Sequence, residues 1–302
     1  MLTDSKYVVI SPAKDEAGRI EATIQSMLSQ TIRPIRWVIV DDASRDRTPE
    51  ILEFYRQQVS WITVIRVDRD AERKLGSAEI LAFEVGFRSV ESESFDFIVK
   101  LDCDLKFAPD YFEQLLARFH ATPNLGIASG VYLERNGSGW VEVKMPRYHA
   151  SGASKMIRAK CYADIGGFPL SPGWDSADEI KAQMKGWKTG HFSELRFYHL
   201  RREGSASGVW GSGMLHGRIY YVTGGGPLFF LFKFGHRLFT SRPGFRGAIA
   251  MLFGYVKAYA IQQKRLVTEV EARFYRRQLN RRLFEGFHKM LKLIDFPGNN
   301  AD

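Results

Sequence analysis

Short apolar runs alternate with amphipathic stretches through the first 120 residues of the chain. The apolar runs, which are rich in Val, Ile and aromatic residues and predict buried β-strands, are residues 7–10, 36–40, 61–67 and 95–101. The amphipathic stretches, whose apolar residues recur at helical spacing and predict α-helices, are residues 19–30, 48–58, 77–89 and 109–120. This alternation predicts an α/β fold with a mostly parallel central sheet and helices on both faces.

The pattern changes twice further along the chain. From about residue 127 to 197 the β-like runs become shorter, and beyond residue 201 the chain is glycine-rich, then aromatic, then basic and helical. We therefore expect an α/β domain over residues 1–200, with halves at 1–105 and 106–200. A basic, aromatic-rich and mainly helical C-terminal region is expected over residues 201–302.

Charge is distributed unevenly between these two regions. The 302 residues hold 43 Lys and Arg against 34 Asp and Glu, a net charge of +9. Residues 1–200 have a net charge of −2, whereas residues 201–302 have 17 basic and 6 acidic side chains and a net charge of +11. A basic region is typical of partners such as nucleic acid, an anionic membrane or a phosphate-bearing ligand. No zinc-finger spacing or aromatic RNA-binding motif is present, so we expect no nucleic-acid partner.

The cysteines and the length of the apolar runs bear on where the protein is located in the cell. Cys103 and Cys161 stand far apart with no CxxC spacing, which fits a reducing environment without structural zinc. The N-terminus lacks a secretory signal pattern. The longest stretch without Asp, Glu, Lys, Arg or His, Ile219–Phe232, contains Pro227 and three glycines and is shorter than the roughly 18 residues of a membrane span. We expect a cytoplasmic protein without a conventional transmembrane helix.

Acidic residues follow three of the predicted strands. They are Asp15 and Glu16 after the first strand, Asp41 and Asp42 after the second, and Asp102 and Asp104 after the fourth. Ligands of such sheets bind beyond the carboxyl ends of the strands, so these side chains should meet at one edge. Strand alternation puts Asp102 and Asp104 on the same side, where both carboxylates can reach one Mg²⁺ or Mn²⁺ ion. Taken singly, each motif also fits an ordinary polar turn or helix cap.

Together these motifs resemble the opening of family 2 glycosyltransferases of the GT-A fold. The resemblance rests on Pro12-Ala13-Lys14-Asp15-Glu16, Leu28-Ser29-Gln30, Asp41-Asp42-Ala43-Ser44 and Asp102-Cys103-Asp104, with Asp15 where the family usually has Asn. IRAKCYADIGGFP resembles the family's acceptor-side strand and turn, so the likeness covers roughly residues 5–200. A dinucleotide-dependent dehydrogenase is disfavoured, because SPAKDE rather than GxGxxG follows the first strand.

The resemblance implies roles for individual residues. Residues expected to hold the nucleotide base and ribose are Ser11, Pro12, Glu16 and Asp42, in the half formed by residues 1–105. Arg73 or Lys74 is expected near the base or the diphosphate. The residues expected to contact ribose and a Mn²⁺ or Mg²⁺ ion are Asp102 and Asp104, with His199 completing the metal site. For each of Arg73, Lys74 and His199 an ordinary solvated or structural role stays open.

An inverting transfer also needs a carboxylate to take the proton of the acceptor hydroxyl. Family members place this base at a helix N-terminus after the Gly-Gly-Phe turn, where this chain has Gly173-Trp174-Asp175-Ser176-Ala177-Asp178-Glu179. Alignment on Gly186-Trp187 favours Asp178, with Asp175 as the alternative and Glu179 third. One of the three is expected only to cap the helix.

The activity implied by the resemblance is inverting, metal-dependent transfer of a sugar from a nucleotide sugar, a UDP-sugar by expectation. The acceptor would be a glycan or a lipid-linked molecule in polysaccharide or glycolipid synthesis. The alternative is a non-catalytic nucleotide-sugar-binding or scaffold protein of the same fold. The basic C-terminal region is expected to bind an anionic membrane surface, on the cytoplasmic face of the inner membrane. Packing on the domain or forming a homodimer are the other uses open to its apolar residues.

Overall fold

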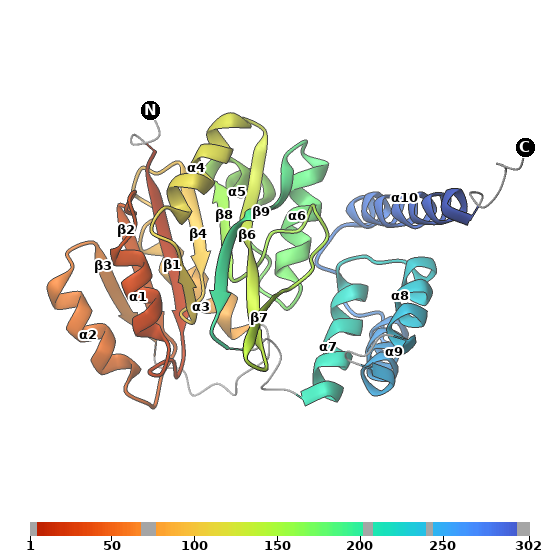
Figure 1. Cartoon of the computed structure of the whole chain (residues 1–302), viewed down its shortest axis with the longest axis horizontal. Coiled ribbons are helices and arrows are strands. Elements are labelled where there is room, and N and C mark those ends of the chain that lie inside the picture. The colour runs from red at the N-terminus through yellow and green to blue at the C-terminus, as the bar shows by residue number, and fades with distance from the viewer. Residues whose placement is uncertain (1–4, 68–76, 202–207, 240–243, 295–302) are drawn as a thin grey trace, which may run out of the picture. The chain divides into compact units, whose positions relative to one another are not determined.

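The computed structural model of the protein describes residues 5–67, 77–201, 208–239 and 244–294. The chain divides into two compact units, Met1–Ser205 and Ala206–Asp302, which are described separately below. Figure 1 shows a strand-rich first unit and a helical second unit.

The first unit begins with the predicted alternation of strands and helices. Its elements up to residue 121 are β1 (Tyr7–Ala13), α1 (Ile20–Leu28), β2 (Arg36–Asp41), α2 (Thr48–Gln58), β3 (Ile62–Arg66), α3 (Ala78–Arg88), β4 (Phe97–Leu101), β5 (Leu105–Phe107) and α4 (Tyr111–Ala121). All four strands and four helices predicted for this part of the chain are confirmed. The strand predicted over residues 7–10 is longer, because Ser11, Pro12 and Ala13 continue the parallel pairing with β2.

Residues 125–199 add more strands and two helices. These elements are β6 (Leu125–Asn136), β7 (Gly139–Glu142), β8 (Ser154–Arg158), α5 (Ala159–Ile165), α6 (Trp174–Met184) and β9 (Lys188–His199). In the described residues they join one sheet of order β3-β2-β1-β4-β8-β6-β9-β5, with β7 paired to β6. The strands from β3 to β4 are parallel, whereas β8 is antiparallel to both β4 and β6. The expected α/β architecture with helices on both faces is therefore present. The sheet is parallel from β3 to β4 as expected, but the strands from residue 105 onward add antiparallel pairings and make it mixed.

Strand alternation divides the core of the first unit into two layers. Tyr7, Val9 and Val99 face a layer of apolar residues from α1, α2 and α4. The neighbouring residues Val8 and Ile98 face the opposite layer, which contains residues of α3, α5 and α6. The sheet is thus covered on both faces, and its strand ends are left as the place where polar groups gather.

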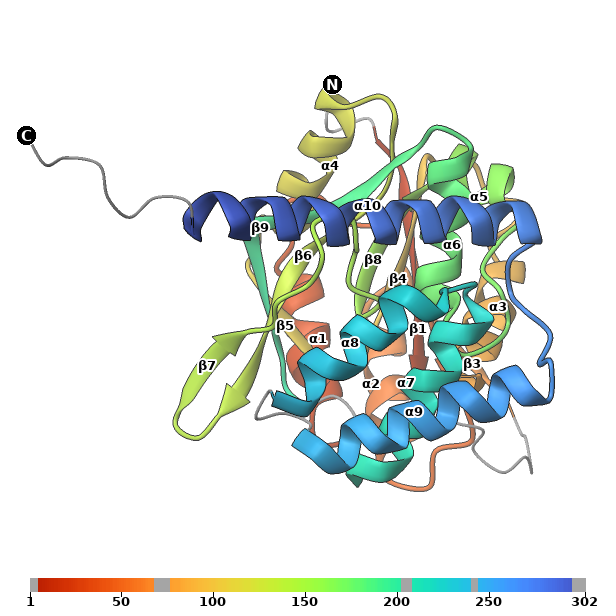
Figure 2. The ribbon, with the colours of Figure 1, turned by 90° about the vertical axis from the view of Figure 1, so that its right-hand side faces the viewer.

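The second unit is helical where it is described. Its elements are α7 (Gly208–Val222), α8 (Pro227–Phe239), α9 (Gly244–Ala260) and α10 (Glu269–Ile294), and Figure 2 shows α7, α8 and α9 grouped together. Aromatic rings form much of its interior, and Phe230 stacks on Tyr255 with ring centroids 4.0 Å apart. Two hydrogen bonds connect the end of α7 and the turn after it to the C-terminal part of the unit. The N–H of Leu266, just before α10, donates to the Val222 carbonyl (2.8 Å), and Arg276 Nε on α10 donates to the Gly224 carbonyl (3.0 Å).

Candidate active site

The loops after β1 and β2 hold each other in place. The Asp15 N–H donates to Ser44 Oγ (2.9 Å), and the Arg45 N–H donates to Asp15 Oδ1 (2.8 Å). Asp15 and Ala43 both have φ of +54°, a left-handed conformation that allows each loop to turn sharply. Because β1 lies between β2 and β4 in the parallel part of the sheet, the residues after all three strands come to the same edge.

Asp102, Asp104 and His199 form a cluster that fits a divalent metal ion. One candidate ligand atom from each residue lies within 4.8 Å of the others, and His199 Nε2 is 3.2 Å from Asp104 Oδ1. The antiparallel pairing of β5 with β9 sets Leu105 opposite His199 and thereby brings the histidine beside the two aspartates. Two carboxylates and an imidazole are a donor set used by Mn²⁺ and related ions. The predicted Asp-x-Asp-His grouping is therefore present in the structure.

Arg201 crosses this acidic edge. Its guanidinium pairs with Glu16, and its Nε lies 3.4 Å from Asp104 Oδ2. Burial and the charge of Asp104 raise the pKa of Glu16 to about 7, although Arg201 opposes that shift. At Asp104 burial disfavours ionisation, but the hydrogen bond from His199 and the charges of His199 and Arg201 outweigh it and lower the pKa. Arg201 thus supplies positive charge where three strand ends place carboxylates.

The other residues expected at the nucleotide are placed differently. Asp42 lies at the end of β2 and is largely buried, with its N–H donating to the Ala13 carbonyl (2.8 Å). Ser11 and Pro12 lie within β1, and Ser11 Oγ accepts a hydrogen bond from Trp37 Nε1 (2.9 Å) in the core. Arg73 and Lys74 lie outside the described residues. The structure therefore brings Glu16, Asp42 and the Asp102 loop to one edge of the sheet. The Ser11 hydroxyl instead points into the core, where it bonds to Trp37.

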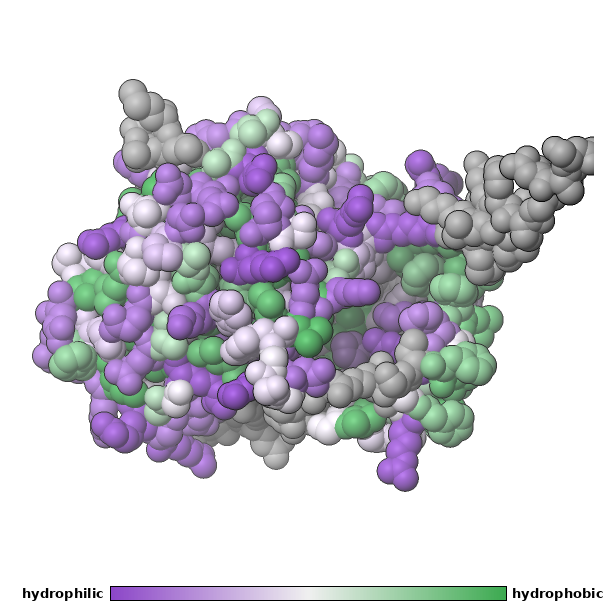
Figure 3. Space-filling view, in the orientation of Figure 1, coloured by the Kyte–Doolittle hydropathy of each residue, from purple (hydrophilic) through white to green (hydrophobic). Residues whose placement is uncertain are grey.

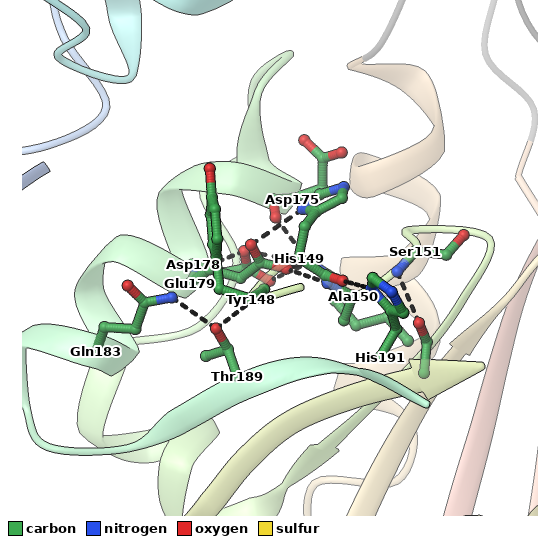
Figure 4. A network of polar contacts seen from close by, with 12 residues as sticks. Tyr148, His149, Ala150, Ser151, Asp175, Asp178, Glu179, Gln183, Thr189 and His191 are labelled. Atoms are coloured by element: carbon green, nitrogen blue, oxygen red, sulfur yellow. Dashed lines mark hydrogen bonds and ion pairs between the residues drawn. The ribbon is translucent and has the colours of Figure 1, made fainter. Parts of the chain in front are cut away.

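The three carboxylates considered as the base have different surroundings on α6. Asp178 is fully buried, and its Oδ2 accepts a hydrogen bond from Lys155 Nζ at 3.0 Å. Glu179 is also buried, and its Oε1 lies 3.3 Å from the same Lys155 nitrogen. Asp175 is half-buried on the first turn, and Figure 4 shows its carboxylate pointing away from the Asp178–Glu179 contacts. Only the backbone carbonyl of Asp175 accepts a hydrogen bond from Lys155 (2.7 Å).

Glu179 also fixes the loop before β8. Its Oε1 accepts a hydrogen bond from the Ala150 N–H (2.7 Å), and its Oε2 lies 3.0 Å from His149 Nδ1. Burial opposes the charged form of His149, but the charge and hydrogen bond of Glu179 outweigh it and raise the histidine's pKa to about 9. Burial raises the pKa of Asp178 to about 7 against the lowering effect of Lys155. The loop and the helix start are thus joined by ionic contacts (Figure 4).

A second buried lysine lies beside the metal-binding cluster. Lys100, on β4, pairs with both Glu79 at the start of α3 and Asp102 after β4. Burial opposes its charge, but the two carboxylates raise its pKa above the usual value for lysine. Burial also raises the pKa of Asp102 to about 6, although Lys100 acts in the opposite direction. Lys100 therefore holds Asp102 by a direct ion pair.

Lys100, Lys155 and His149 were not expected from motif reasoning. A usable signal exists for Lys100, which interrupts the otherwise apolar strand FIVKL, whereas the strand SKMIR around Lys155 has polar residues at both ends and gives no such signal. A lysine at such a position is almost never fully buried unless it is paired with carboxylates. No comparable pattern marks His149.

Comparison with known proteins gives a consistent result. The family model described as Glycosyl transferase family 2 matches residues 8–169. Among solved structures, a mannosyltransferase from Pyrobaculum calidifontis in complex with GDP-Man and Mn²⁺ is 17% identical. The superposed region covers 95% of this chain and 84% of the mannosyltransferase chain, with a TM-score of 0.57.

Two further structures have the same fold. TarS residues 1–349 from S. aureus, in complex with UDP-GlcNAc, is 17% identical over 84% of this chain and 73% of its own, with a TM-score of 0.53. GalNAc-T7 with UDP, GalNAc and Mn²⁺ is 15% identical over 86% of this chain and 55% of its own, with a TM-score of 0.56. No curated protein sequence matches the chain. At these identities the structural likeness establishes the GT-A fold.

Proposed function

Because the chain belongs to glycosyl transferase family 2, we propose that it is an inverting, metal-dependent glycosyltransferase. One observation carries the proposal: Asp175 and the metal-binding cluster both neighbour the same short segment, residues 152–153. The Asp102 N–H donates to the Ala153 carbonyl (2.8 Å). A Cβ built on the adjacent Gly152 would lie 3.7 Å from the Asp175 Cβ. A carboxylate and a candidate metal site next to each other are the groups that sugar transfer from a nucleotide requires.

Asp175 is the base in this proposal, in preference to Asp178 and Glu179. Asp175 is partly exposed, whereas Asp178 and Glu179 are buried and paired with Lys155. In the reaction the acceptor oxygen forms a bond to the anomeric carbon while the bond from that carbon to the diphosphate oxygen breaks. Asp175 takes the proton from the acceptor hydroxyl, and the configuration at the anomeric carbon inverts.

Asp102, Asp104 and His199 would hold Mn²⁺ or Mg²⁺, with Mn²⁺ favoured by the imidazole. Such an ion, when bound, neutralises charge on the departing nucleotide diphosphate. Asp42 and Glu16 lie at the same edge and would contact the nucleoside. Arg201 is close enough to exchange its contact with Asp104 for the diphosphate.

The proposed donor is a UDP-sugar carrying a hexose or N-acetylhexosamine. Its support is that the solved relatives include complexes with UDP-GlcNAc and UDP. The relative with GDP-Man makes a guanine nucleotide the competing possibility. The proposed acceptor is a glycan or a lipid-linked molecule of polysaccharide or glycolipid synthesis.

We also propose that the second unit binds an anionic membrane surface. None of the helices in the described residues is long and apolar enough to cross a bilayer. The exposed apolar residues of α8 recur along one helical face, and they are Leu228, Leu231, Phe232 and Phe239. Figure 3 shows apolar side chains gathered over α8 and α9.

Charge supports the same surface. The sequence has no Asp or Glu from residue 204 to 268, yet this stretch contains Arg218, Lys233, Arg237 and five other basic residues. Cations beside exposed Phe and Leu are typical of helices that lie in the headgroup region of anionic bilayers. The corresponding location is the cytoplasmic face of the inner membrane, where a soluble donor can meet a lipid-linked acceptor. A homodimer through the same residues stays a competing prediction.

The proposed activity is tested first by thermal shift and then by turnover. UDP-Glc, UDP-GlcNAc and GDP-Man are each added to the protein with MnCl₂ or with EDTA. A rise in Tm that requires Mn²⁺ and is larger for one UDP-sugar is expected. Release of UDP from that sugar is then measured for the wild type and for Asp175→Asn, which should lose at least about 100-fold in kcat. Full turnover by Asp175→Asn would show that the base is elsewhere, and absence of any nucleotide response would contradict the proposed function.

A further inference from the structure

Lys155 is a buried cation that the proposed chemistry does not use directly. It lies on β8, and its Nζ is within hydrogen-bond distance of three groups on α6. These are the Asp175 carbonyl at 2.7 Å, Asp178 Oδ2 at 3.0 Å and Glu179 Oε1 at 3.3 Å. All three belong to the first two turns of the helix that carries Asp175.

The start of α6 lacks the usual side-chain cap. The N-cap position is Gly173, at φ +94°, and no side chain at that position bonds to the first helical N–H groups. A cap of this kind normally fixes the direction in which a helix begins. Here the first turn is instead held from outside the helix, by the strand lysine through the Asp175 carbonyl.

The second turn of α6 is tied through Glu179 to the loop before β8. Glu179 Oε1 accepts the Ala150 N–H and also contacts Lys155 Nζ, while Glu179 Oε2 contacts His149. The Lys155 ammonium also lies 5.1 Å from the ring centroid of Trp174, the residue before Asp175. Lys155 is therefore the group that joins β8, the indole and the helix start.

We propose that Lys155 is a positioning residue for Asp175: it fixes the first turn of α6 and so sets the direction of the Asp175 carboxylate toward the acceptor hydroxyl. The inference rests on the proposed role of Asp175 as the base. Displacing a catalytic group by about 1 Å can cost about 100-fold in rate, so a lost anchor should act mainly on kcat. A lysine that only neutralised Asp178 and Glu179 would affect stability and leave turnover of the folded enzyme unchanged.

Three variants separate these roles. Lys155→Met removes the anchor but leaves buried carboxylates, so it can fail to fold. Lys155→Met combined with Asp178→Asn removes the cation together with one of its carboxylate partners and favours a folded protein. Arg158→Met is the matched control, because Arg158 is on the same strand but donates to the Leu125 and Phe119 carbonyls instead of to α6.

The measurements are Tm, affinity for UDP with Mn²⁺, and kcat and KM for the nucleotide sugar that gives the largest thermal shift. We expect kcat of the double variant to fall about 100-fold, with KM and UDP affinity within about threefold of the wild type. Arg158→Met should lower Tm while keeping kcat. A double variant with wild-type kcat would overturn the positioning role and leave neutralisation as the function of Lys155. A failure of the proposed function is recognised separately, because the wild type would then show no response to any nucleotide sugar. A wrong choice of base is recognised by full turnover of Asp175→Asn.

Discussion

Lys100 and Lys155 lie directly opposite each other on the neighbouring strands β4 and β8, and both are fully buried. Their ammonium groups lie 5.6 Å and 5.1 Å from the centroid of the same indole ring, that of Trp174. Lys100 pairs with Asp102 of the metal-binding cluster, whereas Lys155 pairs with Asp178 and Glu179 of the helix that carries the proposed base. The metal-binding cluster and the start of α6 are thus each held by one of two lysines that face each other across β4 and β8.

The two lysines should differ in how much they contribute to stability. The partners of Lys155 are almost completely enclosed, so Lys155→Met should cost about 3–5 kcal/mol in the free energy of unfolding. The partners of Lys100, Glu79 and Asp102, have side chains 42% and 26% exposed, so water can replace part of the lost interaction. Lys100→Met should therefore cost clearly less. Urea unfolding of both variants checks the order, and equal losses would contradict it.

The sequence predicted the alternating strands and helices because buried parallel strands and amphipathic helices differ in period. It also predicted Asp102, Asp104 and His199 as a group, and β5–β9 pairing brings them together. Among Asp175, Asp178 and Glu179 it favoured Asp178, whereas the base proposed from the structure is Asp175, because these residues differ mainly in burial. Asp178 and Glu179 are buried as ion pairs with Lys155, which lies more than 20 residues earlier in the sequence. No local sequence pattern predicts such a pairing.

His149 should make stability depend on pH. Its pKa is about 9 in the folded protein, above the ordinary value of about 6.5 expected when unfolded. A raised pKa stabilises the fold below pH 6.5, and this contribution is lost as pH rises from about 6.5 to 9. His149→Gln should remove that part of the pH dependence. Urea unfolding at pH 6, 7.5 and 9 measures it.

His120→Gln, at an exposed position on α4, is the matched control for this measurement. It should leave the pH dependence of the free energy of unfolding as in the wild type. If His149→Gln and the wild type lose the same free energy of unfolding between pH 6 and 9, then the contact of His149 with Glu179 does not hold an imidazolium.

Asp104 should be required for the response to metal. Asp104→Asn replaces one of the two carboxylates in the cluster. The affinity for Mn²⁺ should therefore fall at least about tenfold, and the rise in Tm produced by Mn²⁺ should be smaller or lost. Asp110→Asn, at the N-cap of α4, is the control and should keep the wild-type response. Titration with Mn²⁺ followed by EDTA measures both variants. An unchanged response in Asp104→Asn would remove this residue from the metal site.

The crossing of α7 and α9 should depend on glycine. A Cβ added at Gly217 would overlap the Met251 carbonyl, and one added at Gly254 would overlap the Met214 carbonyl. Both obstacles are backbone atoms, so either Gly→Ala change should cost about 1–3 kcal/mol by forcing the helices apart.

Gly235, on α8, is the control, because a Cβ added there meets nothing within 4 Å. Gly235→Ala should therefore be neutral or stabilise by up to about 1 kcal/mol, because alanine favours the helix. Thermal melts of the three variants decide whether close packing of α7 on α9 holds the second unit together.

The exposed face of α8 should control binding to anionic vesicles. Leu231 and Phe232 are 61% and 47% exposed, and replacing both by Ser removes apolar groups that would enter the headgroup region. Each such side chain contributes about 1.5–3 kcal/mol when buried, so the double variant should bind at least about tenfold more weakly. Phe54→Ser is the matched control, since Phe54 is 57% exposed on α2 of the first unit and should not affect vesicle binding.

Sedimentation with phosphatidylglycerol vesicles at low and high salt measures the effect. Equal binding by the Leu231–Phe232 variant and the wild type would show that α8 is not the membrane-binding face, and no binding at low salt would remove the membrane proposal itself.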